Sequence, residues 1–460
     1  MIDKIFLENF KAFKQAEFEL KPITILVGPN NGGKSTLIQS IILIQQTLLG
    51  VGNNAVNLNG TKNFGNFIDL VNQKSGKKEV CIKLDFDDRT SVKFKVAEDG
   101  SNLFIKDFSC NTGEFEYHLT DLSLRDYKKE LVAYSQKCDI IFDRDILEKN
   151  KIPAWHLEPI FYRDKFFFKI SDIGDSSILV NQYLKAVKSQ VQKKEKNSLI
   201  MDIWADRSLK KLMEVISFYS NIIKSSNDFY KKMENYFSNI QYIGPLRNPA
   251  NRSYARGSYN YVGAMGEHAV QILAENPKLK DDVEKYFLEM DIANALNISG
   301  SANEKNFEFR IKTKITNDEV NFADIGFGTS QILPIIVQSS MSNKESLVII
   351  EQPELHLHPR VQASLADFFV KLATKKQKFL LETHSDYLLE RLRYNIIEKN
   401  ILTEDVAIYY IEQSEAEKCS TITKININSN GQYSNLPEHY ITNFKFEETR
   451  MITRKILENL

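Results

Sequence analysis

The stretch GPNNGGKS, residues 28–35, decides the fold that this sequence predicts. It satisfies the pattern G-x-x-x-x-G-K-[ST] in full, after the strand-like run at 23–28 and before the apolar, helix-like run at 34–49. Glycine is needed in such a turn because backbone amides must approach phosphate oxygens through conformations that a Cβ atom forbids. The helix that follows directs its N-terminal amides at the anion. The stretch therefore predicts a phosphate-binding loop.

The side chains of this loop have separable chemical tasks. Lys34 is expected to bridge the outer phosphates of a nucleotide, and the Ser35 hydroxyl is expected to ligate Mg²⁺. The residues predicted to bind the nucleotide here are Asn30, Asn31, Gly32, Gly33, Lys34, Ser35 and Thr36.

A second motif is SLVIIEQPELHLHPR, residues 346–360, in which four apolar residues run directly into acidic ones. A carboxylate at the end of a strand, here Glu351, can orient Mg²⁺, through water. The next residue, Gln352, can orient water through its amide but cannot accept a proton. Glu354 could replace it as a base if its side chain turns inward. A buried structural strand would also supply the apolar run, but would rarely end in EQPE.

The stretch DIGFGTSQILP, residues 324–334, is a second glycine-rich turn before an apolar helix. Gly328, Ser330 and Gln331 are its candidate binding residues. One chain needs only one phosphate cradle, so a second cradle suggests a site that another subunit completes. An ordinary helix start capped by Ser330 is the structural alternative.

The fourth motif is FLLETHSDYLLERL, residues 379–392, an apolar strand that ends at His384 and precedes a helix. A histidine at such a strand tip can donate a hydrogen bond to a terminal phosphate. Most lone histidines have no such task. The order and spacing of the four motifs favour the functional interpretation.

The whole chain sets wide limits. It has 460 residues, 42% of them hydrophobic and 26% charged, enough for two or three domains. Lysine plus arginine and aspartate plus glutamate both number 60, so net charge gives no sign of nucleic-acid binding. No apolar run approaches the ~20 residues that span a bilayer, and no signal peptide is evident. We expect a cytoplasmic protein without a membrane partner. Its cysteines have no paired spacing: Cys81, Cys110, Cys138 and Cys419.

The pattern of the chain predicts three parts. Residues 1–120 contain the phosphate loop and, over 79–120, alternation typical of antiparallel hairpins. Residues 121–240 have longer, helix-like patterns and are expected to form an inserted helical lobe. Residues 241–460 contain the other three motifs, and between 322 and 411 helices alternate with strands as in a parallel α/β sheet.

The four motifs in this order resemble the ABC-type ATPases of the RecF, SMC and overcoming-lysogenisation-defect kind. Both ends of the chain also resemble standalone prokaryotic AAA-family ATPases, many from phage-defence operons, in ENFKAFKQAEFELKPITILVGPNNGGKSTL (8–37), YIGPLR (242–247) and NSNGQYSNLPEHY (428–440). PtuA-type ATPases of the Septu system, which work with an HNH nuclease, are the most specific resemblance. The resemblance implies an α/β P-loop NTPase of the ABC-ATPase head type. Such a head has a mixed sheet flanked by helices and an antiparallel β subdomain.

The resemblance also implies cofactors and partners. In ABC-type enzymes two ATP molecules, with Mg²⁺, are held between two heads. The loop around Gly326, Gly328, Ser330 and Gln331 would face the phosphate loop of a second subunit. A homo-oligomer built from such head dimers is expected to control a partner nuclease, of HNH type first and Toprim type second.

Three functions stay open at this point. The chain can be a slow or regulated ATPase in antiphage defence, a RecF-like DNA-repair ATPase, or a nearly inactive nucleotide-sensing scaffold. It is not expected to cut DNA itself, because it contains no HNH-type histidine cluster and about seventy residues after the His384 helix are too few for a Toprim domain. Arg247, Arg252 and Arg256 lie among tyrosines, so that loop can bind nucleic acid or simply connect two parts of the chain.

Overall fold

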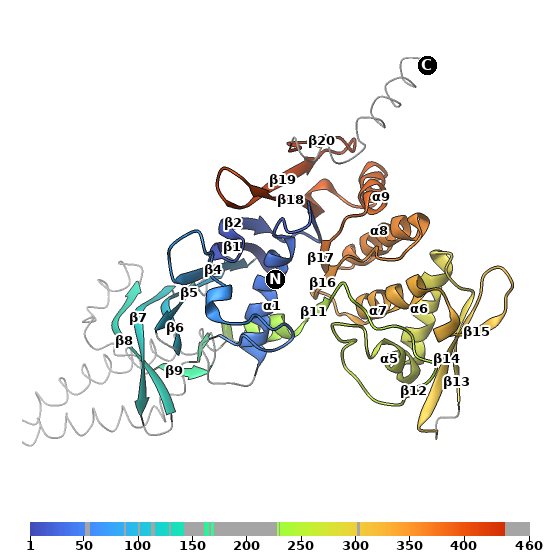
Figure 1. Ribbon diagram of the computed structural model, residues 1–460, viewed down its shortest axis with the longest axis horizontal. Coiled ribbons are helices and arrows are strands. Elements are labelled where there is room, and N and C mark those ends of the chain that lie inside the picture. The colour runs from blue at the N-terminus through green and yellow to red at the C-terminus, as the bar shows by residue number, and fades with distance from the viewer. Residues whose placement is uncertain are drawn as a thin grey trace, which may run out of the picture. The chain divides into compact units, whose positions relative to one another are not determined.

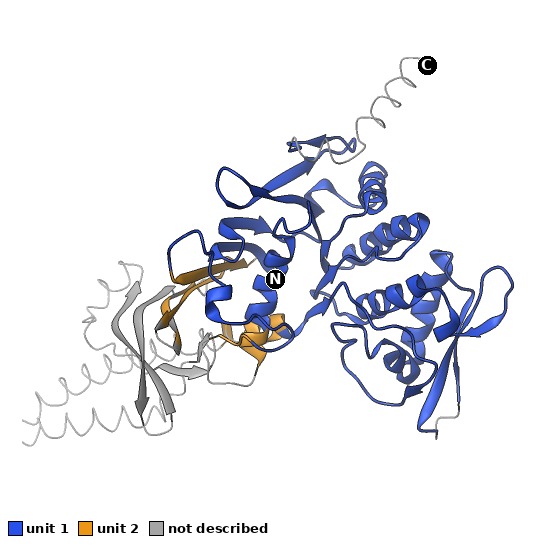
Figure 2. Cartoon of the chain, viewed as in Figure 1, with its two compact units in different colours: residues 1–45, 59–77, 238–460 blue, residues 46–58, 78–237 orange. Residues whose placement is uncertain are grey.

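In the computed structural model the chain forms two compact units (Figures 1 and 2). The first comprises residues 1–45, 59–77 and 238–460, and the second comprises residues 46–58 and 78–237. The residues that the structure describes are 1–50, 56–86, 89–99, 102–111, 116–127, 130–141, 161–164, 167–169, 228–229, 231–300 and 304–437.

A seven-stranded sheet forms the centre of the first unit, in the order β11-β16-β17-β3-β18-β19-β20. The first five strands run parallel and the last two are antiparallel to their neighbours. Every residue of β3, β16 and β17 is buried, as expected where helices cover both faces of a parallel sheet. The strands are β3 (Ile23–Val27), β11 (Ile240–Ile243), β16 (Leu347–Glu351), β17 (Lys378–Glu382), β18 (Val406–Ser414), β19 (Cys419–Ile427) and β20 (Tyr433–Ser434).

Four helices follow the site-forming turns of this sheet. α8 packs against β17 and β3, and α7 packs against β11 and β16. Helix α9 begins after Ser385, whose hydroxyl accepts a hydrogen bond from the amide of Leu388 at 3.1 Å and so caps the helix. The helices are α1 (Lys34–Leu49), α7 (Phe327–Met341), α8 (Pro359–Ala373) and α9 (Asp386–Ile397).

The strand order brings three motifs to one edge of the sheet. The phosphate loop follows β3, the EQPE turn follows β16 and the THS turn follows β17. Since these strands are neighbours and parallel, their carboxyl ends lie along the same edge, where open α/β sheets bind ligands. Turns that are more than 300 residues apart in the sequence therefore meet.

Smaller elements complete the first unit. A hairpin forms from β1 and β2, and a second small sheet has the order β12-β14-β13 with β15 paired to β14. Helices α5 and α6 pack beside this small sheet. The bounds are β1 (Ile2–Phe10), β2 (Phe13–Glu19), α5 (Ala269–Glu275), α6 (Pro277–Glu289), β12 (Tyr254–Ala255), β13 (Ala295–Ser299), β14 (Asn306–Lys312) and β15 (Glu319–Asn321).

The second unit is an antiparallel sheet in the residues that the structure describes. The predicted hairpins over 79–120 are confirmed by the pairing of β4 with β5, β5 with β6 and β6 with β7. The strands are β4 (Glu79–Phe86), β5 (Ser91–Asp99), β6 (Asn102–Asn111), β7 (Glu116–Tyr127), β8 (Glu130–Ile141), β9 (Phe161–Asp164) and β10 (Phe167–Lys169).

One sequence prediction in this unit is wrong. Residues 121–136 were expected to be helical, but 121–127 lie in β7 and 130–136 lie in β8, and the two strands pair from Glu116 opposite Ile141 to Tyr127 opposite Glu130. Leu122 and Leu124 alternate with polar residues, as in a strand, although the longer stretch also fits a helix. Pairing with the neighbouring strand decided in favour of the strand.

The remainder of the inserted lobe is not tested. The predicted helix at 176–197 and most of the one at 208–240 lie outside the described residues, and 231–238 is helical. The helical lobe over 121–240 therefore stays a prediction for its undescribed part. In the described ranges, no helix combines the length and the apolar character needed to cross a membrane.

Candidate nucleotide site at the edge of the sheet

The loop after β3 has the backbone conformation that its glycines predict. Gly28 has φ of 139°, Asn31 of 63° and Gly33 of 109°, all in the region that side chains avoid. A Cβ atom on Gly28 would lie 2.1 Å from the carbonyl oxygen of Ile411 in β18. Residue 28 must therefore be glycine, both for its dihedral angle and for the close approach of the neighbouring strand.

Lys34 is folded back onto this loop. Its ammonium Nζ donates hydrogen bonds to the carbonyl oxygens of Gly28 and Pro29, each at 2.9 Å, and the residue is only 4% exposed. Burial lowers the pKa of Lys34, while the nearby carboxylates of Glu382 and Glu354 act in the opposite direction. Both hydrogen-bond partners are neutral, so the ammonium fits an anion placed in the loop.

Ser35 contacts a carboxylate that the sequence motifs did not single out. Its hydroxyl Oγ donates a hydrogen bond to Oε2 of Glu382 at 2.8 Å. Glu382 is the last residue of β17 and is in register with Glu351, the last residue of β16. Burial raises the pKa of Glu382 and the charge of Glu351 adds to this, while Ser35 and Lys34 lower it. Two buried carboxylates thus end adjacent strands.

Glu351 is held by two residues that no motif predicted. Its Oε1 accepts hydrogen bonds from Nζ of Lys62 at 2.6 Å and from the hydroxyl of Tyr242 at 2.7 Å. The Lys62 ammonium also lies 4.8 Å from the centre of the Tyr242 ring. Burial raises the pKa of Tyr242, with the charge of Glu351 as the second cause. Lys62 has no sequence signal that could have identified it, and Tyr242 appeared only as the first residue of YIGPLR (242–247), without a role.

Glu354 joins the EQPE turn to the THS turn. Its Oε1 accepts a hydrogen bond from the backbone amide of His384 at 2.6 Å, and its Oε2 accepts one from the Thr383 hydroxyl at 2.7 Å. Burial raises the pKa of Glu354, and these hydrogen bonds lower it. Both carboxylate oxygens are therefore used inside the chain.

The side chains of Gln352 and His384 are less constrained than the carboxylate of Glu354. Gln352 is in the left-handed region with φ of 48°, and no residue of the described ranges forms a hydrogen bond with its side-chain amide. His384 is exposed, but its ring is partly desolvated. This partial burial, followed by the charge of Lys34, lowers the pKa of His384. A neutral imidazole still has one N–H that can donate to a phosphate oxygen.

The glycine-rich turn forms the start of α7. Gly326 precedes the helix without a side-chain cap, and Ser330 donates from Oγ to the carbonyl of Phe327 at 2.7 Å. Ser330 is therefore not the N-cap that the structural alternative required. The Gln331 amide donates to the carbonyl oxygen of Arg247 at 3.3 Å. Within the described part of the chain, no hydrogen bond connects this turn with the phosphate loop.

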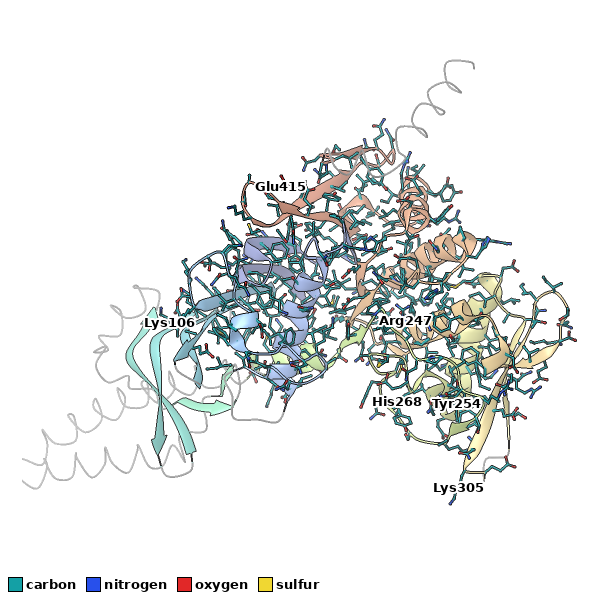
Figure 3. All side chains as sticks on the ribbon, viewed as in Figure 1. Lys106, Arg247, Tyr254, His268, Lys305 and Glu415 are labelled. Carbon is teal, nitrogen blue, oxygen red and sulfur yellow. The ribbon has the colours of Figure 1, made fainter. Side chains whose placement is uncertain are left out.

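Arg247 lies between this turn and the EQPE turn (labelled in Figure 3). Its Nη2 donates to the carbonyl oxygens of Glu351 at 2.7 Å and Gln352 at 3.2 Å. The side chain is buried, and burial lowers its pKa to about 10. Its Nε and Nη1 have no hydrogen-bond partner in the residues that the structure describes. Arg247 is thus part of the site rather than of a nucleic-acid surface.

The other arginines of that loop are bound within the chain. Arg252 contacts both carboxylate oxygens of Asp324, at 2.6 and 3.1 Å. Arg256 lies 3.5 Å from a carboxylate oxygen of Glu275. These ion pairs favour the interpretation of the loop as a connection between parts of the first unit.

The residues present fit Mg²⁺ together with a nucleotide. Mg²⁺ in such sites is held by one or two carboxylates and by substrate phosphates rather than by an all-protein cage. Ser35, Glu382 and Glu351 can supply the protein part of such a site. No group of three or more His, Cys, Asp or Glu side chains in the described ranges could hold a metal ion.

A prediction concerns the two glycines of the turn before α7. A Cβ atom on Gly328 would lie 2.4 Å from the backbone oxygen of His356, whereas one on Gly326 would meet nothing within 4 Å. Gly328→Ala is expected to lower the free energy of unfolding by about 1–3 kcal/mol, because the backbone must move. Gly326→Ala should cost below about 1 kcal/mol. Urea unfolding measures both, and equal costs would contradict the close approach.

The geometry defines the class of protein. A phosphate loop after β3, carboxylates at the ends of two neighbouring parallel strands, and helices on a mixed sheet make a P-loop ATPase head of the ABC type. The profile of the family described as AAA ATPase domain matches residues 1–389, and the chain belongs to this family.

Known proteins of the SMC class are similar to this chain. The chromosome partition protein Smc of Methanocaldococcus jannaschii is 25% identical over 225 residues, which are 46% of this chain and 18% of that protein. The chain thus covers only a small share of that relative's length. Together with the family match, this similarity supports an ATPase of the RecF and SMC kind.

Solved SMC head domains are among the structures that this chain matches. The Pyrococcus furiosus Smc head with an extended coiled coil, bound to the C-terminal domain of ScpA, has a TM-score of 0.43 and 13% identity, covering 99% of both chains. The SMC head of Thermotoga maritima has a TM-score of 0.38 and 9% identity, covering 93% of this chain and 99% of that one. TM-scores below 0.5 do not establish the fold, which here is defined by the strand order and the phosphate loop.

Proposed function

We propose that this chain is a slow, regulated ATPase subunit whose ATP state controls an oligomer and a partner nuclease in antiphage defence. The observation that supports ATP binding most directly is the pair Lys34 and Ser35. The first is buried with only neutral partners, and the second is bound to a carboxylate at the sheet edge.

Each site residue has a task in this proposal. Lys34 neutralises the outer phosphates. Ser35 and Glu351 would hold Mg²⁺, which would supply positive charge to the phosphates. The exposed His384 donates a hydrogen bond to the terminal phosphate, and the Gln352 amide orients the attacking water. Because an amide accepts no proton, turnover is slow.

Glu354 is a positioning residue in this proposal rather than the base. Its two oxygens already accept hydrogen bonds from the His384 amide and the Thr383 hydroxyl. A carboxylate so engaged holds the THS turn against the EQPE turn. It thereby places His384 at the edge where the terminal phosphate would lie.

Substitutions at 352 and 354 test the proposed chemistry. Gln352→Glu should raise ATP turnover by about 10²-fold or more, since it adds a general base. Glu354→Gln should lose less than about 10-fold, since an amide can still bond to His384 and Thr383, while Glu354→Ala should lose about 10²-fold. Phosphate release under single-turnover conditions measures all three. If Glu354→Gln were as inactive as Glu354→Ala and Gln352→Glu brought no gain, Glu354 would be the base.

The proposed oligomer is a head dimer that holds ATP between two chains. Support comes from the start of α7, where the side chain of Phe327 is half exposed and a Cβ atom on Gly326 would meet nothing within 4 Å. This turn has no hydrogen bond to the phosphate loop of its own chain in the described residues. It is therefore available to the nucleotide of a second chain.

The nuclease partner rests on the resemblance to ATPases of defence operons. The test is to identify the reading frame beside its gene and to co-express its product with this chain; an HNH or Toprim nuclease that copurifies only with the intact ATP-bound oligomer is the expected result. The RecF-like alternative gains no support from the arginine loop, whose Arg252 and Arg256 are paired with acids of the same unit.

A further inference from the structure

The backbone of Gln352 has an unfavourable conformation that neighbouring groups hold in place. Its φ of 48° lies in the left-handed region, which a residue with a Cβ atom rarely adopts. The amide of Gln352 donates to the carbonyl oxygen of Glu382 at 2.7 Å, and the carbonyl oxygen of Gln352 accepts from the amide of Leu355 at 3.3 Å. The same carbonyl oxygen accepts from Nη2 of Arg247 at 3.2 Å. Left-handed residues of this kind cluster at functional sites, where the surrounding contacts fix them.

Arg247 fixes the peptide groups on both sides of Gln352. Its Nη2 also donates to the carbonyl oxygen of Glu351 at 2.7 Å, so one nitrogen holds two consecutive carbonyls. Arg247 can reach them because it follows β11, in which Ile243 lies opposite Ile350 of β16. The residue is 4% exposed, and its Nε and Nη1 have no hydrogen-bond partner in the described ranges. A buried guanidinium bonded to backbone carbonyls fixes orientation, because its planar donors are rigid.

The same arginine is bonded to the start of α7. The side-chain amide of Gln331, which is 2% exposed, donates to the carbonyl oxygen of Arg247 at 3.3 Å. The first turn of α7 also packs on the segment after the EQPE turn. The ring centres of Phe327 and His356 are 4.9 Å apart, and a Cβ atom on Gly328 would lie 2.4 Å from the His356 backbone oxygen. Close-packed contacts transmit displacement, so a shift of α7 reaches the peptides that Arg247 holds.

We propose that Arg247 is a positioning residue, which holds Gln352 in place and connects it to the start of α7. Through this connection, the contact of α7 with the nucleotide of a second chain sets the position of the amide that orients the attacking water. The inference rests on the proposed function and divides it into two parts. The phosphate loop binds ATP without Arg247, whereas turnover depends on Arg247.

Arg247→Lys and Arg247→Met test the positioning role. The affinity for the fluorescent analogue mant-ATP with Mg²⁺ should stay near its original value, because Lys34 and Ser35 are unchanged. Single-turnover release of phosphate from ATP should slow by about 10-fold to 10²-fold, since a misplacement of about 1 Å can cost 10²-fold. Arg247→Lys keeps the positive charge and covers the case in which Arg247→Met does not fold. A single-turnover rate equal to that of the unchanged protein in Arg247→Lys would overturn the proposal.

Arg256→Met is the matched control. Arg256 comes from the same loop and belongs to the same unit, but its guanidinium lies 3.5 Å from a carboxylate oxygen of Glu275 instead of bonding to the EQPE turn. The variant should keep both the mant-ATP affinity and the single-turnover rate. If Arg256→Met slowed turnover as much as Arg247→Met, the loss would reflect general damage to the loop and would overturn the proposal.

A double-mutant cycle with Gln352→Ala identifies the group through which Arg247 acts. Arg247→Lys should have little further effect on the single-turnover rate of Gln352→Ala, because the side chain that it positions is already absent. Gln331→Met, which removes the hydrogen bond from α7 to Arg247, should behave in the same way. Losses that multiply would overturn the positioning role for Arg247, and the connection to α7 for Gln331. Failure of the proposed function gives a different result, because the unchanged protein would then bind no mant-ATP or release no phosphate.

Discussion

Lys34→Met is expected to remove ATP binding while the fold persists. Methionine keeps most of the side-chain volume but removes the ammonium, which is 4% exposed and bonded only to the carbonyls of Gly28 and Pro29. Removing one partner of a buried charge pair costs about 2–5 kcal/mol, so affinity for ATP should fall by roughly 30-fold to 4,000-fold. Isothermal titration with ATP and Mg²⁺ measures this loss.

Lys378→Met is the matched control for this variant. The Lys378 ammonium is also buried and also donates to two backbone carbonyls, those of Ile2 at 3.0 Å and Leu20 at 2.9 Å, at the opposite end of β17 from Glu382. Lys378→Met should change the free energy of unfolding and leave the ATP affinity unaltered. If it weakened ATP binding as much as Lys34→Met, the loss would reflect general damage to the sheet.

Lys34→Met also tests the head dimer. Gly326→Arg places a bulky cation at the start of α7, where a Cβ atom would meet nothing within 4 Å, and should prevent ATP-dependent association, as Lys34→Met does by removing the nucleotide. A mixture of the two variants can form one complete site, with the phosphate loop from one chain and the start of α7 from the other. Sedimentation velocity should therefore recover an ATP-dependent dimer in the mixture alone. No recovery would contradict a shared site.

Gly28→Ala is expected to be the most destabilising single change in the phosphate loop. Its Cβ atom would lie 2.1 Å from the backbone oxygen of Ile411, and the residue has φ of 139°. Overpacking against backbone costs about 1–3 kcal/mol and a forced dihedral angle about 1–3 kcal/mol more. The free energy of unfolding should fall by roughly 2–6 kcal/mol.

Gly76→Ala separates the cost of overpacking from the cost of the forced dihedral angle. Gly76 has φ of 69°, and a Cβ atom there would meet nothing within 4 Å. It should therefore cost only the strain of a left-handed backbone, about 1–2 kcal/mol. Chemical denaturation of both variants gives the comparison. If the two costs were equal, the approach of β18 to the loop would not be what requires glycine at residue 28.

Local patterns predicted those parts of the site that depend on a few consecutive residues. Helix α7 begins earlier than expected, at Phe327, so that Gly328, Ser330 and Gln331 lie inside the helix rather than in a turn before it. The phosphate loop and the strand that ends at Glu351 lie where the sequence expects them. These predictions succeeded because a glycine turn between a strand and a helix is specified by adjacent residues. The helix expected over 121–136 was wrong because its pattern was compatible with both structures, and the pairing of β7 with β8 made residues 121–127 and 130–136 strands.

The sequence by itself determined that this chain has a phosphate loop, an acidic strand end and a strand-end histidine in the order of ABC-type ATPases. Only the tertiary structure decided which charges meet there. Glu382 reaches Ser35 because β17 lies beside β3, and Tyr242 reaches Glu351 because β11 lies beside β16. Lys62, from a third distant segment, also reaches Glu351. Contacts across such distances depend on strand order, which no short stretch of sequence encodes.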